Sequence, residues 1–416
     1  MMKYDLVIAG GGAAGLAAAA SFIKELNKDG EGVGGFGASV CVLEKNDAPG
    51  RKINATGGGR CNLTNEACPE KGMTLDFFRS IGIETWRDSE GRYYPYTNKA
   101  SDVTKALVDA LSTACGDECA TVEVRCGFEI KVISRLKAAA DSEDAVSEAN
   151  DMGNFMITGM VKEDPSKAPA MEMIFADNVI IAMGGKAGPQ YGTTGDGYTI
   201  ARTLGHTVTR VFPILTGVEC KADGVDFADL KGVRAKGTVI LNKDGSQIVR
   251  DTGEIQFTEN GISGICVFNL TPHIKADKWE NFEDALKRYS ITVDLAPDFT
   301  EEQLAKRGSS FGILTEKLAA VIDAAGDGGN GNAADIKNWQ LEITGIKGWR
   351  DAQATFGGVA LDEIDMETME SRLVPGLYFA GEIIDAQGPC GGFNLQNAWE
   401  TGIKAARAII NRRSED

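Results

Sequence analysis

Runs of apolar residues divide the first part of the chain into strands and helices. Tyr4–Ala9 is an apolar run of strand length, and strong helix formers follow it over Ala13–Leu26. The β-branched stretch Ser39–Glu44 indicates a second strand. Two further apolar runs, Val179–Gly185 and Leu377–Ala380, lead into glycines. This alternation predicts an α/β fold with a Rossmann-like domain.

The middle and the end of the chain show other periodicities. Residues 236–261 alternate strand-like runs with Asp-Gly turns, and residues 338–349 return to a strand pattern. Helical spacing is expected over residues 281–290 and 300–326. A last helix places eight residues on one face: Leu395, Ala398, Trp399, Gly402, Ile403, Ala406, Ile409 and Ile410. Packing into a core explains this stripe.

The N-terminal apolar run has a second interpretation, as a targeting or membrane segment. Leu6–Ile23 carries no charge and follows Lys3. Asp5 weakens the basic leader that a signal peptide needs, and Gly10–Gly12 disfavour a continuous helix. We therefore interpret the run as the start of the fold and expect no membrane span.

The turn after the first strand has the spacing of a dinucleotide-binding motif. Gly10, Gly12 and Gly15 form G-x-G-x-x-G between a strand and a helix, whose N-terminal N–H groups favour phosphate. Glu44 ends the next strand, where an acidic residue binds a ribose hydroxyl. A glycine-rich loop, Asn27–Ala38, explains why Glu44 lies farther along than usual. The combination predicts a dinucleotide site rather than a structural turn.

A second glycine-rich turn, Gly388–Gly392, precedes the last helix. FAD is longer than NAD and ends in an isoalloxazine ring that gains negative charge on reduction, which a helix N-terminus stabilises. Two glycine–helix ends with one fingerprint predict a single extended FAD, tightly bound. The chain shows no second G-x-G-x-x-G after a strand. NADH or NADPH would therefore bind only transiently.

Between these turns stands Thr56–Asn65, TGGGRCNLTN. Its glycines permit a close approach to a flat ligand, and Asn62 offers an amide near the ring. Arg51, a few residues upstream, can pair with phosphate. A flexible linker would not need Arg, Cys and Asn here, so we interpret the segment as part of the cofactor site.

The composition of the chain excludes several classes of binding partner. A chain of 416 residues predicts two or three domains, and a net charge of -17 argues against nucleic acid and anionic membranes. Nine cysteines without a disulfide framework favour a reducing cytoplasm. With two histidines, and no second pair beside Cys115 and Cys119 at zinc-ligand spacing, no metal site is predicted.

Longer strings resemble the BaiN-like flavoproteins, a bacterial family of the two-dinucleotide-binding-domain class. They are DLVIAGGGAAGLAAA, GRKINATGGGRCNLTN, AMGGKAGPQYGTTGDGYTIARTLGHTV, GEIQFTENGISG and GGVALDEIDMETMESRLVPGLYFAGEIIDAQGPCGGFNLQNAW, spread along the whole chain. The resemblance implies a glutathione-reductase-like, Rossmann-like FAD-binding domain with an inserted β-barrel-like substrate domain and a small helical subdomain.

The resemblance also suggests domain bounds. These are 1–206 and 355–416 for the FAD-binding domain, 207–272 and 334–354 for the barrel, and 273–333 for the helical insertion. The loop at Asn27–Ala38 and an acidic excursion at Lys137–Asn154 depart from the family pattern.

Motifs and resemblance together give a set of predicted FAD contacts. They are Gly10, Gly12, Ala13, Ala14, Gly15, Glu44, Lys45, Arg51, Lys52, Gly58, Gly59, Arg60, Cys61, Asn62, Met183, Gly184, Gly185, Gly381, Glu382, Gly391, Gly392, Phe393, Asn394 and Leu395. The resemblance implies that Glu382 holds the ribityl or phosphate region.

Hydride chemistry belongs to the flavin, and the protein adds position and a proton. No catalytic residue is assigned, and the candidates are Cys390, Tyr191 and Asn62. Cys390 precedes a helix, which would lower a thiol pKa, but it could also be a small packing residue. Tyr191 is a substrate-side donor or a turn residue. His206, after a helix capped by Gly205, is expected to be structural.

Four functions remain open. The leading hypothesis is an FAD enzyme that takes electrons from NAD(P)H and reduces a small organic substrate, with an enone or dienone such as an oxidised bile acid implied by the resemblance. The second is an oxidase of a small amine that uses oxygen. The third is a flavin-dependent RNA-modifying protein, which the net charge disfavours. The fourth is a non-catalytic flavoprotein. No oligomeric state is predicted.

Overall fold

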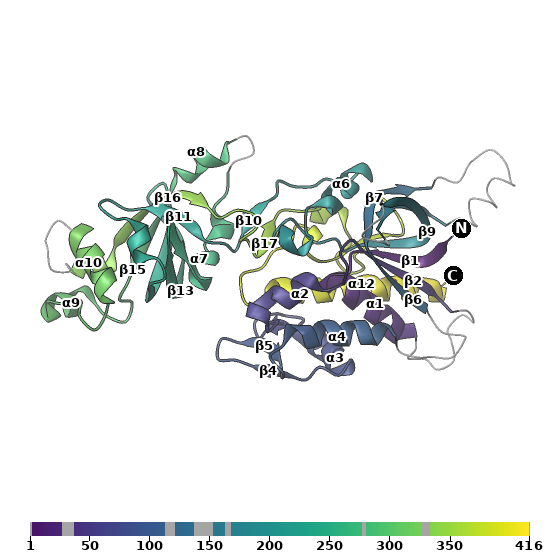
Figure 1. Ribbon diagram of the computed structural model, residues 1–416, viewed down its shortest axis with the longest axis horizontal. Coiled ribbons are helices and arrows are strands. Elements are labelled where there is room, and N and C mark those ends of the chain that lie inside the picture. Colours follow the sequence, from purple (N-terminus) through teal and green to yellow (C-terminus); the bar gives the residue numbers. More distant parts are fainter. Residues whose placement is uncertain are drawn as a thin grey trace. The chain divides into compact units, whose positions relative to one another are not determined.

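A computed structural model describes residues 2–26, 37–112, 121–136, 153–162, 168–276, 280–325 and 333–415. The Asn27–Ala38 loop and the Lys137–Asn154 excursion lie largely outside these residues, and Cys115 and Cys119 wholly outside them. Contacts divide the chain into two compact units (Figure 1). One is Met1–Phe212 with Thr355–Asp416, and the other is Pro213–Ala354.

The first unit is built on a Rossmann-type sheet. Its parallel strands are β6 (Thr121–Cys126), β2 (Ser39–Glu44), β1 (Lys3–Ala9) and β9 (Ala170–Ile181), in that order, with β18 (Leu377–Phe379) also on β9. Strands β8 (Phe155–Val161) and β7 (Phe128–Arg135) continue it antiparallel. The paired ends of β1, β2, β9 and β18 bring four carboxyl ends to one edge of the sheet.

Helices α1 (Ala13–Leu26), α4 (Ala100–Leu111) and α12 (Phe393–Glu415) lie along one side of this sheet (Figure 1). Helices α1 and α12 pack closely, because a Cβ on Gly402 would overlap the carbonyl of Ala14. The remaining elements of this unit are α2 (Arg51–Ala55), η1 (Thr56–Gly59), β3 (Thr64–Asn65), α3 (Lys71–Ser80), β4 (Thr85–Arg87), β5 (Arg92–Pro95), η2 (Pro189–Tyr191), α6 (Asp196–Thr203), η5 (Leu361–Glu363) and η6 (Gly381–Ile383). Strands β3, β5 and β4 form a small sheet.

The second unit is a closed barrel with short helices. Its strands are β11 (Val218–Lys221), β14 (Gly261–Ser263), β13 (Ser246–Thr258), β12 (Arg234–Lys243), β15 (Tyr289–Asp294) and β16 (Trp339–Ile346). Its helices are η3 (Phe227–Leu230), α7 (Ile265–Phe268), η4 (Thr271–His273), α8 (Phe282–Leu286), α9 (Glu301–Arg307), α10 (Glu316–Ala325) and α11 (Ala333–Lys337). The chain enters through β10 (Phe212–Ile214) and leaves through β17 (Ala354–Phe356), which pair. The barrel and the Rossmann-type sheet confirm the predicted fold class.

Two helix predictions in the barrel unit were wrong in extent. Within 281–290 only the short α8 forms, capped by Asn281, and β15 follows because its residues alternate between buried and half-buried. The stretch 300–326 is two helices, since α9 ends at Gly308 with a φ of 62°. The predicted helical insertion 273–333 thus contains a barrel strand, and its separation from the barrel stays a prediction.

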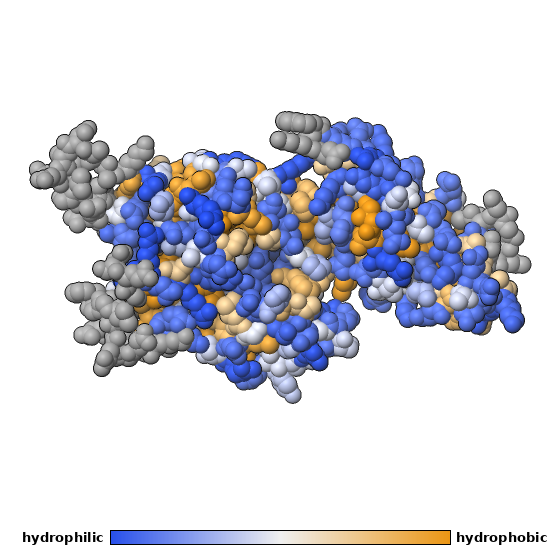
Figure 2. Space-filling view, turned by 180° about the vertical axis from the view of Figure 1, so that it is seen from behind, coloured by the Kyte–Doolittle hydropathy of each residue, from blue (hydrophilic) through white to orange (hydrophobic). Residues whose placement is uncertain are grey.

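None of the helices in the described chain combines the length and the apolar character needed to cross a membrane. The N-terminal apolar run forms β1 and α1 instead. On the face shown in Figure 2, hydrophilic residues predominate and hydrophobic residues form smaller patches between them.

His206 is a buried titratable group in the first unit, 4% exposed. Its Nε2 lies 2.7 Å from the Ser371 hydroxyl, and its ring packs edge-on against Phe379. Its Nδ1 is buried without a hydrogen-bond partner among the described residues. Burial therefore holds the pKa of His206 below its ordinary value. This placement agrees with the structural role expected from the sequence.

We predict that His206 makes the protein sensitive to acid. The unfolded chain takes up a proton at His206 near pH 6.5, whereas the folded site resists it. The stabilisation is therefore complete above about pH 6.5 and is lost as the pH falls toward the lower folded pKa. In denaturant unfolding, His206→Gln should lose less free energy between pH 7 and pH 5 than the wild type. Burial also lowers the pKa of His273, so His273→Gln measures a separate contribution of the same sign; equal slopes for wild type and His206→Gln would refute the prediction.

Candidate functional site

Four parallel strands end at one edge of the Rossmann-type sheet, and predicted site residues stand at each end. Gly10 follows β1, Glu44 ends β2, Met183–Gly185 follow β9, and Gly381 follows β18. The N–H of Gly10 donates to the carbonyl of Leu43 at 2.8 Å, which joins the first two ends. Ligands of open α/β sheets bind outside this edge.

The three glycines of the first turn are required for different reasons. Gly10 has a φ of 110°, and a Cβ there would lie 2.5 Å from the Ala182 oxygen. A Cβ on Gly15 would overlap the Gly10 carbonyl, so the fold itself requires both glycines. Nothing lies within 4 Å of a Cβ on Gly12, and its φ is outside the left-handed region. The open space at Gly12 fits the phosphates of a dinucleotide, which need close access to this backbone.

Glu44 is fixed at the same edge. It is 8% exposed, and its Oε2 accepts a hydrogen bond from the N–H of Gly11 at 3.0 Å. Its Oε1 accepts from the backbone and side-chain nitrogens of Asn46. A carboxylate offers about four acceptor positions, so room remains for one hydroxyl. Sequence reasoning missed Asn46, although it stands two residues after the strand-ending acid.

The predicted cations near this edge differ in their partners. Lys45 pairs with Asp196 at 2.8 Å. Burial opposes ionisation of Asp196, but the hydrogen bond from Lys45 helps to outweigh it and holds the pKa of that carboxyl below its ordinary value. Arg51 is exposed and lies 3.7 Å from Asp47. Arg51 also donates to the Asn46 side-chain oxygen at 3.1 Å, and its predicted contact with phosphate stays a prediction.

Glu382 ties several segments of the first unit together. Its Oε2 accepts from Lys52 Nζ at 2.7 Å and from the N–H of Gly185 at 3.4 Å. Its Oε1 accepts from the N–H of Thr355 at 2.7 Å, and the Thr355 hydroxyl in turn accepts from the N–H of Lys186. The implied contact of Glu382 with the cofactor stays a prediction beside this structural role. Thr355 carried no signal in the sequence.

The structure brings the two glycine-rich segments together. The indole Nε1 of Trp399, in α12, donates to the Leu63 carbonyl at 3.0 Å. The amide of Asn65 donates to the Gly391 carbonyl at 3.0 Å, and a Cβ on Gly392 would lie 2.6 Å from the Thr64 oxygen. The end of the segment, Leu63 to Asn65, therefore packs against the start of α12, which does not fit a flexible linker.

Several residues of the segment Thr56–Asn65 have a left-handed backbone conformation. Gly57, Gly58 and Gly59 have φ values of 57°, 66° and 85°, and Cys61 follows with 59°. The Cys61 side chain is fully buried, and burial raises the pKa of its thiol to about 12. Only the backbone of Cys61 is thus in a position to meet a cofactor.

The three catalytic candidates lie in two different parts of the site, two of them near α12 and one near Glu44. The carboxamide of Asn62 is half-buried near α12 and makes no hydrogen bond within the described chain. Cys390, also half-buried, belongs to the turn before α12. Tyr191 lies at the Glu44 side, since its carbonyl accepts from Asn46 at 3.3 Å.

The helix starts hold the other predicted contacts. Ala13 and Ala14 open α1, and Phe393 and Leu395 lie in the first turn of α12. Asn394 braces the second glycine turn, since its side chain both accepts from and donates to the backbone of Gly388 at 2.9 Å.

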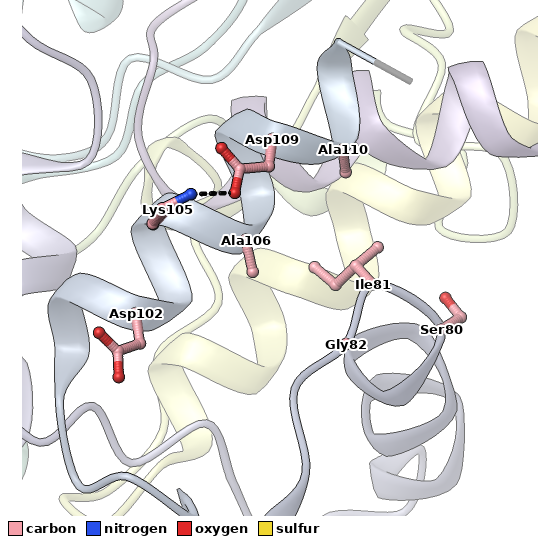
Figure 3. A pocket seen from close by; sticks show the side chains of 8 residues that line it. All are labelled: Ser80, Ile81, Gly82, Asp102, Lys105, Ala106, Asp109 and Ala110. Carbon is pink, nitrogen blue, oxygen red and sulfur yellow. Dashed lines mark hydrogen bonds and ion pairs between the residues drawn. The ribbon is translucent and has the colours of Figure 1, made fainter. Parts of the chain in front are cut away.

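A separate pocket lies between the end of α3 and α4 (Figure 3). Its lining is Ser80, Ile81, Gly82, Asp102, Lys105, Ala106, Asp109 and Ala110. Lys105 pairs with Asp109 within it, and it contains none of the predicted cofactor contacts. Across the described residues, no group of three or more His, Cys, Asp or Glu side chains is placed to hold a metal ion.

The family model described as HI0933-like protein Rossmann domain matches residues 70–408. The chain belongs to the HI0933-like family. It is 33% identical over 451 aligned residues to the 3-dehydro-bile acid delta(4,6)-reductase of Clostridium scindens, covering 97% of this chain and 98% of that one. These matches confirm the predicted BaiN-like flavoprotein family and support an FAD-dependent oxidoreductase.

Two further matches extend over whole chains. The ribosomal RNA dihydrouridine synthase of Escherichia coli is 26% identical over 100% of both chains. The 3-ketosteroid delta1-dehydrogenase of Sterolibacterium denitrificans has a TM-score of 0.52 at 13% identity, covering 99% of this HI0933-like chain and all of that one. At this identity the structural match shows the fold alone.

Gly12→Ala should separate cofactor binding from folding. The new methyl group meets no protein atom, so the free energy of unfolding of the apoprotein should change by less than about 1 kcal/mol. If the FAD phosphates lie against Gly12, the affinity for FAD should fall about tenfold or more. Calorimetry on the apoprotein and FAD titration measure the two effects. Gly72→Ala, in α3 and equally open, is the control; unchanged FAD affinity in Gly12→Ala would contradict this placement.

Proposed function

We propose that the chain is an FAD-dependent reductase that takes electrons from NADH or NADPH and saturates a C=C bond conjugated to a carbonyl in a small organic substrate. The observation that carries this proposal is the paired arrangement of the two glycine turns. One lies at the edge of a parallel sheet with open space at Gly12, and the other starts α12 against Thr56–Asn65. Such a pair suits one long cofactor with phosphates at one end and a flat ring at the other.

The names of two relatives support this reaction type. One relative is a delta(4,6)-reductase of 3-dehydro-bile acids, and another makes dihydrouridine. Both names describe hydrogenation of a C=C bond next to a carbonyl. The shared chemistry therefore supports a reductase, while the substrates differ.

The chain's own residues would prepare this reaction. Bound FAD, once reduced by NADH or NADPH, would supply the hydride. Glu44 is positioned to accept a ribose hydroxyl, and the N-terminus of α12 directs its partial positive charge toward the ring end. Among the catalytic candidates, Cys390 is the titratable group on the α12 side, so we assign it, rather than Tyr191, as the candidate proton donor.

Action on ribosomal RNA is the second candidate function. It is favoured by matches of 26% and 28% identity to two ribosomal RNA dihydrouridine synthases over 98% of the chain or more. A net charge of -17 disfavours it, because the phosphate backbone is held by basic surfaces.

The described cysteines support the expected reducing, cytoplasmic location. Within the described chain no disulfide joins Cys41, Cys61, Cys68, Cys126, Cys220, Cys266 or Cys390.

Anaerobic mixing with NADH and with NADPH tests the proposal. The visible absorption band of the flavin should bleach with one of the two nucleotides, and a steroid enone should then restore it by accepting the electrons. Restoration by a ribosomal RNA transcript, but not by the enone, would favour the second candidate. A band that neither nucleotide bleaches would refute the reductase. Bleaching by small amines would then identify an oxidase, and no bleaching at all a non-catalytic flavoprotein.

A further inference from the structure

Arg60, in the segment between the two glycine turns, stacks on an aromatic ring. Its guanidinium carbon lies 4.5 Å from the ring centroid of Tyr94. Trp86 stacks on the same ring at 5.6 Å, so the small sheet offers a rigid aromatic support. A guanidinium held over a ring face can still offer N–H groups to an acceptor.

The donors of Arg60 are poorly used within the described chain. Its Nε donates to the Gly57 carbonyl at 3.4 Å and its Nη2 to the Tyr94 hydroxyl at 3.5 Å. Both distances exceed the usual 2.9 to 3.0 Å. No carboxylate of the described residues pairs with Arg60.

Its neighbours on the small sheet behave differently. Arg92 pairs with Asp88 at 2.8 Å, and Arg87 pairs with Glu66 at 3.2 Å. Arg60 thus differs from these two arginines in having no carboxylate partner among the described residues. An arginine held over a ring, with donors that make only long hydrogen bonds, is suited to bind an anion.

The surface beside Arg60 is free of side chains. Gly58 and Gly59 precede it and are exposed, and no atom lies closer than 4 Å to a Cβ built on either. The same segment continues into β3, which contacts the turn before α12 through Asn65. Arg60 therefore stands at the end of the site where α12 begins, next to bare backbone on which a flat molecule can lie.

We propose that Arg60, supported by Tyr94, is the anion-binding residue of the substrate site, and that the substrate is a flat enone carrying an acid group. This inference rests on the proposed function. The chemistry recognised is an anionic group, and the phosphates of NAD(P)H or of FAD are its other sources. Arg60 acts in binding and takes no part in proton or hydride transfer.

The test uses oxidised, FAD-loaded protein, so that binding is measured without turnover. 3-Oxo-4-cholenoic acid and its methyl ester are titrated separately, and the shift of the visible flavin band reports each dissociation constant. The wild type should bind the acid about tenfold or more tightly than the ester, because a charge-assisted bidentate pair is lost with the ester. Arg60→Gln should bind both ligands about equally, and Arg60→Lys should keep part of the preference.

Matched variants control for folding and for general charge. Arg87→Gln removes an exposed arginine of the small sheet that contains Tyr94 and should keep the preference for the acid. Tyr94→Phe keeps the stacked ring and should also keep most of it. Because Arg60 is exposed, the thermal midpoint of Arg60→Gln should match that of the wild type.

Three outcomes would overturn the assignment. One is a wild type that does not distinguish acid from ester, or an Arg60→Gln variant that still does. Another is a variant that loses FAD, which would assign Arg60 to the cofactor phosphates. The third is a variant whose only defect is slower flavin reduction by NADPH or NADH, which would assign it to the nucleotide. A preference for the acid in a protein that no nucleotide reduces would refute the proposed function and leave this site standing.

Discussion

The close approach of α1 to the end of β1 is the constraint on which the site depends. Gly15 has no room for a Cβ because the Gly10 carbonyl fills that space. This contact fixes the start of α1 directly beyond the strand, with its N–H groups and partial positive charge facing the sheet edge. A similar contact joins α12 to α1, because the Ala14 backbone leaves no space for a Cβ on Gly402. The start of α1 is thus held by two backbone contacts, at Gly15 and at Gly402, that only glycine permits.

Charged side chains hold this backbone arrangement in place. Glu44 accepts hydrogen bonds from the first glycine turn and from Asn46, and Glu382 accepts them from Lys52, Gly185 and Thr355. Partly buried carboxylates with several donors are strongly ordered, because losing one donor leaves a charge poorly solvated. The edge of the sheet is consequently held by hydrogen bonds within the protein, and such order lowers the cost of binding a ligand there.

Local patterns predicted the parts of the fold that depend on local physics. The span of α1, the strand ending at Glu44 and the glycine turns all have short-range signals, and the structure contains them. Strand β15 was missed because the helix capped by Asn281 ends after five residues, and the alternation that follows was included in the helix. Thr355 and the burial of Cys61 depend on segments far apart in the sequence, so no local signal reports them.

The net charge of the chain is likewise an incomplete guide to its function. A total of -17 describes the average surface and disfavours a polyanionic partner, but it does not determine the local charge at a site. Most cations near the site are neutralised at short range, as Lys45 is by Asp196 and Lys52 by Glu382. The opposite charges of such a pair largely cancel at a distance, so a cation without a carboxylate partner contributes most to the local electrostatic field. Arg60 lies over the Tyr94 ring beside exposed glycine backbone and has no carboxylate partner among the described residues, which is why we propose that an acidic chain can still select an anionic ligand.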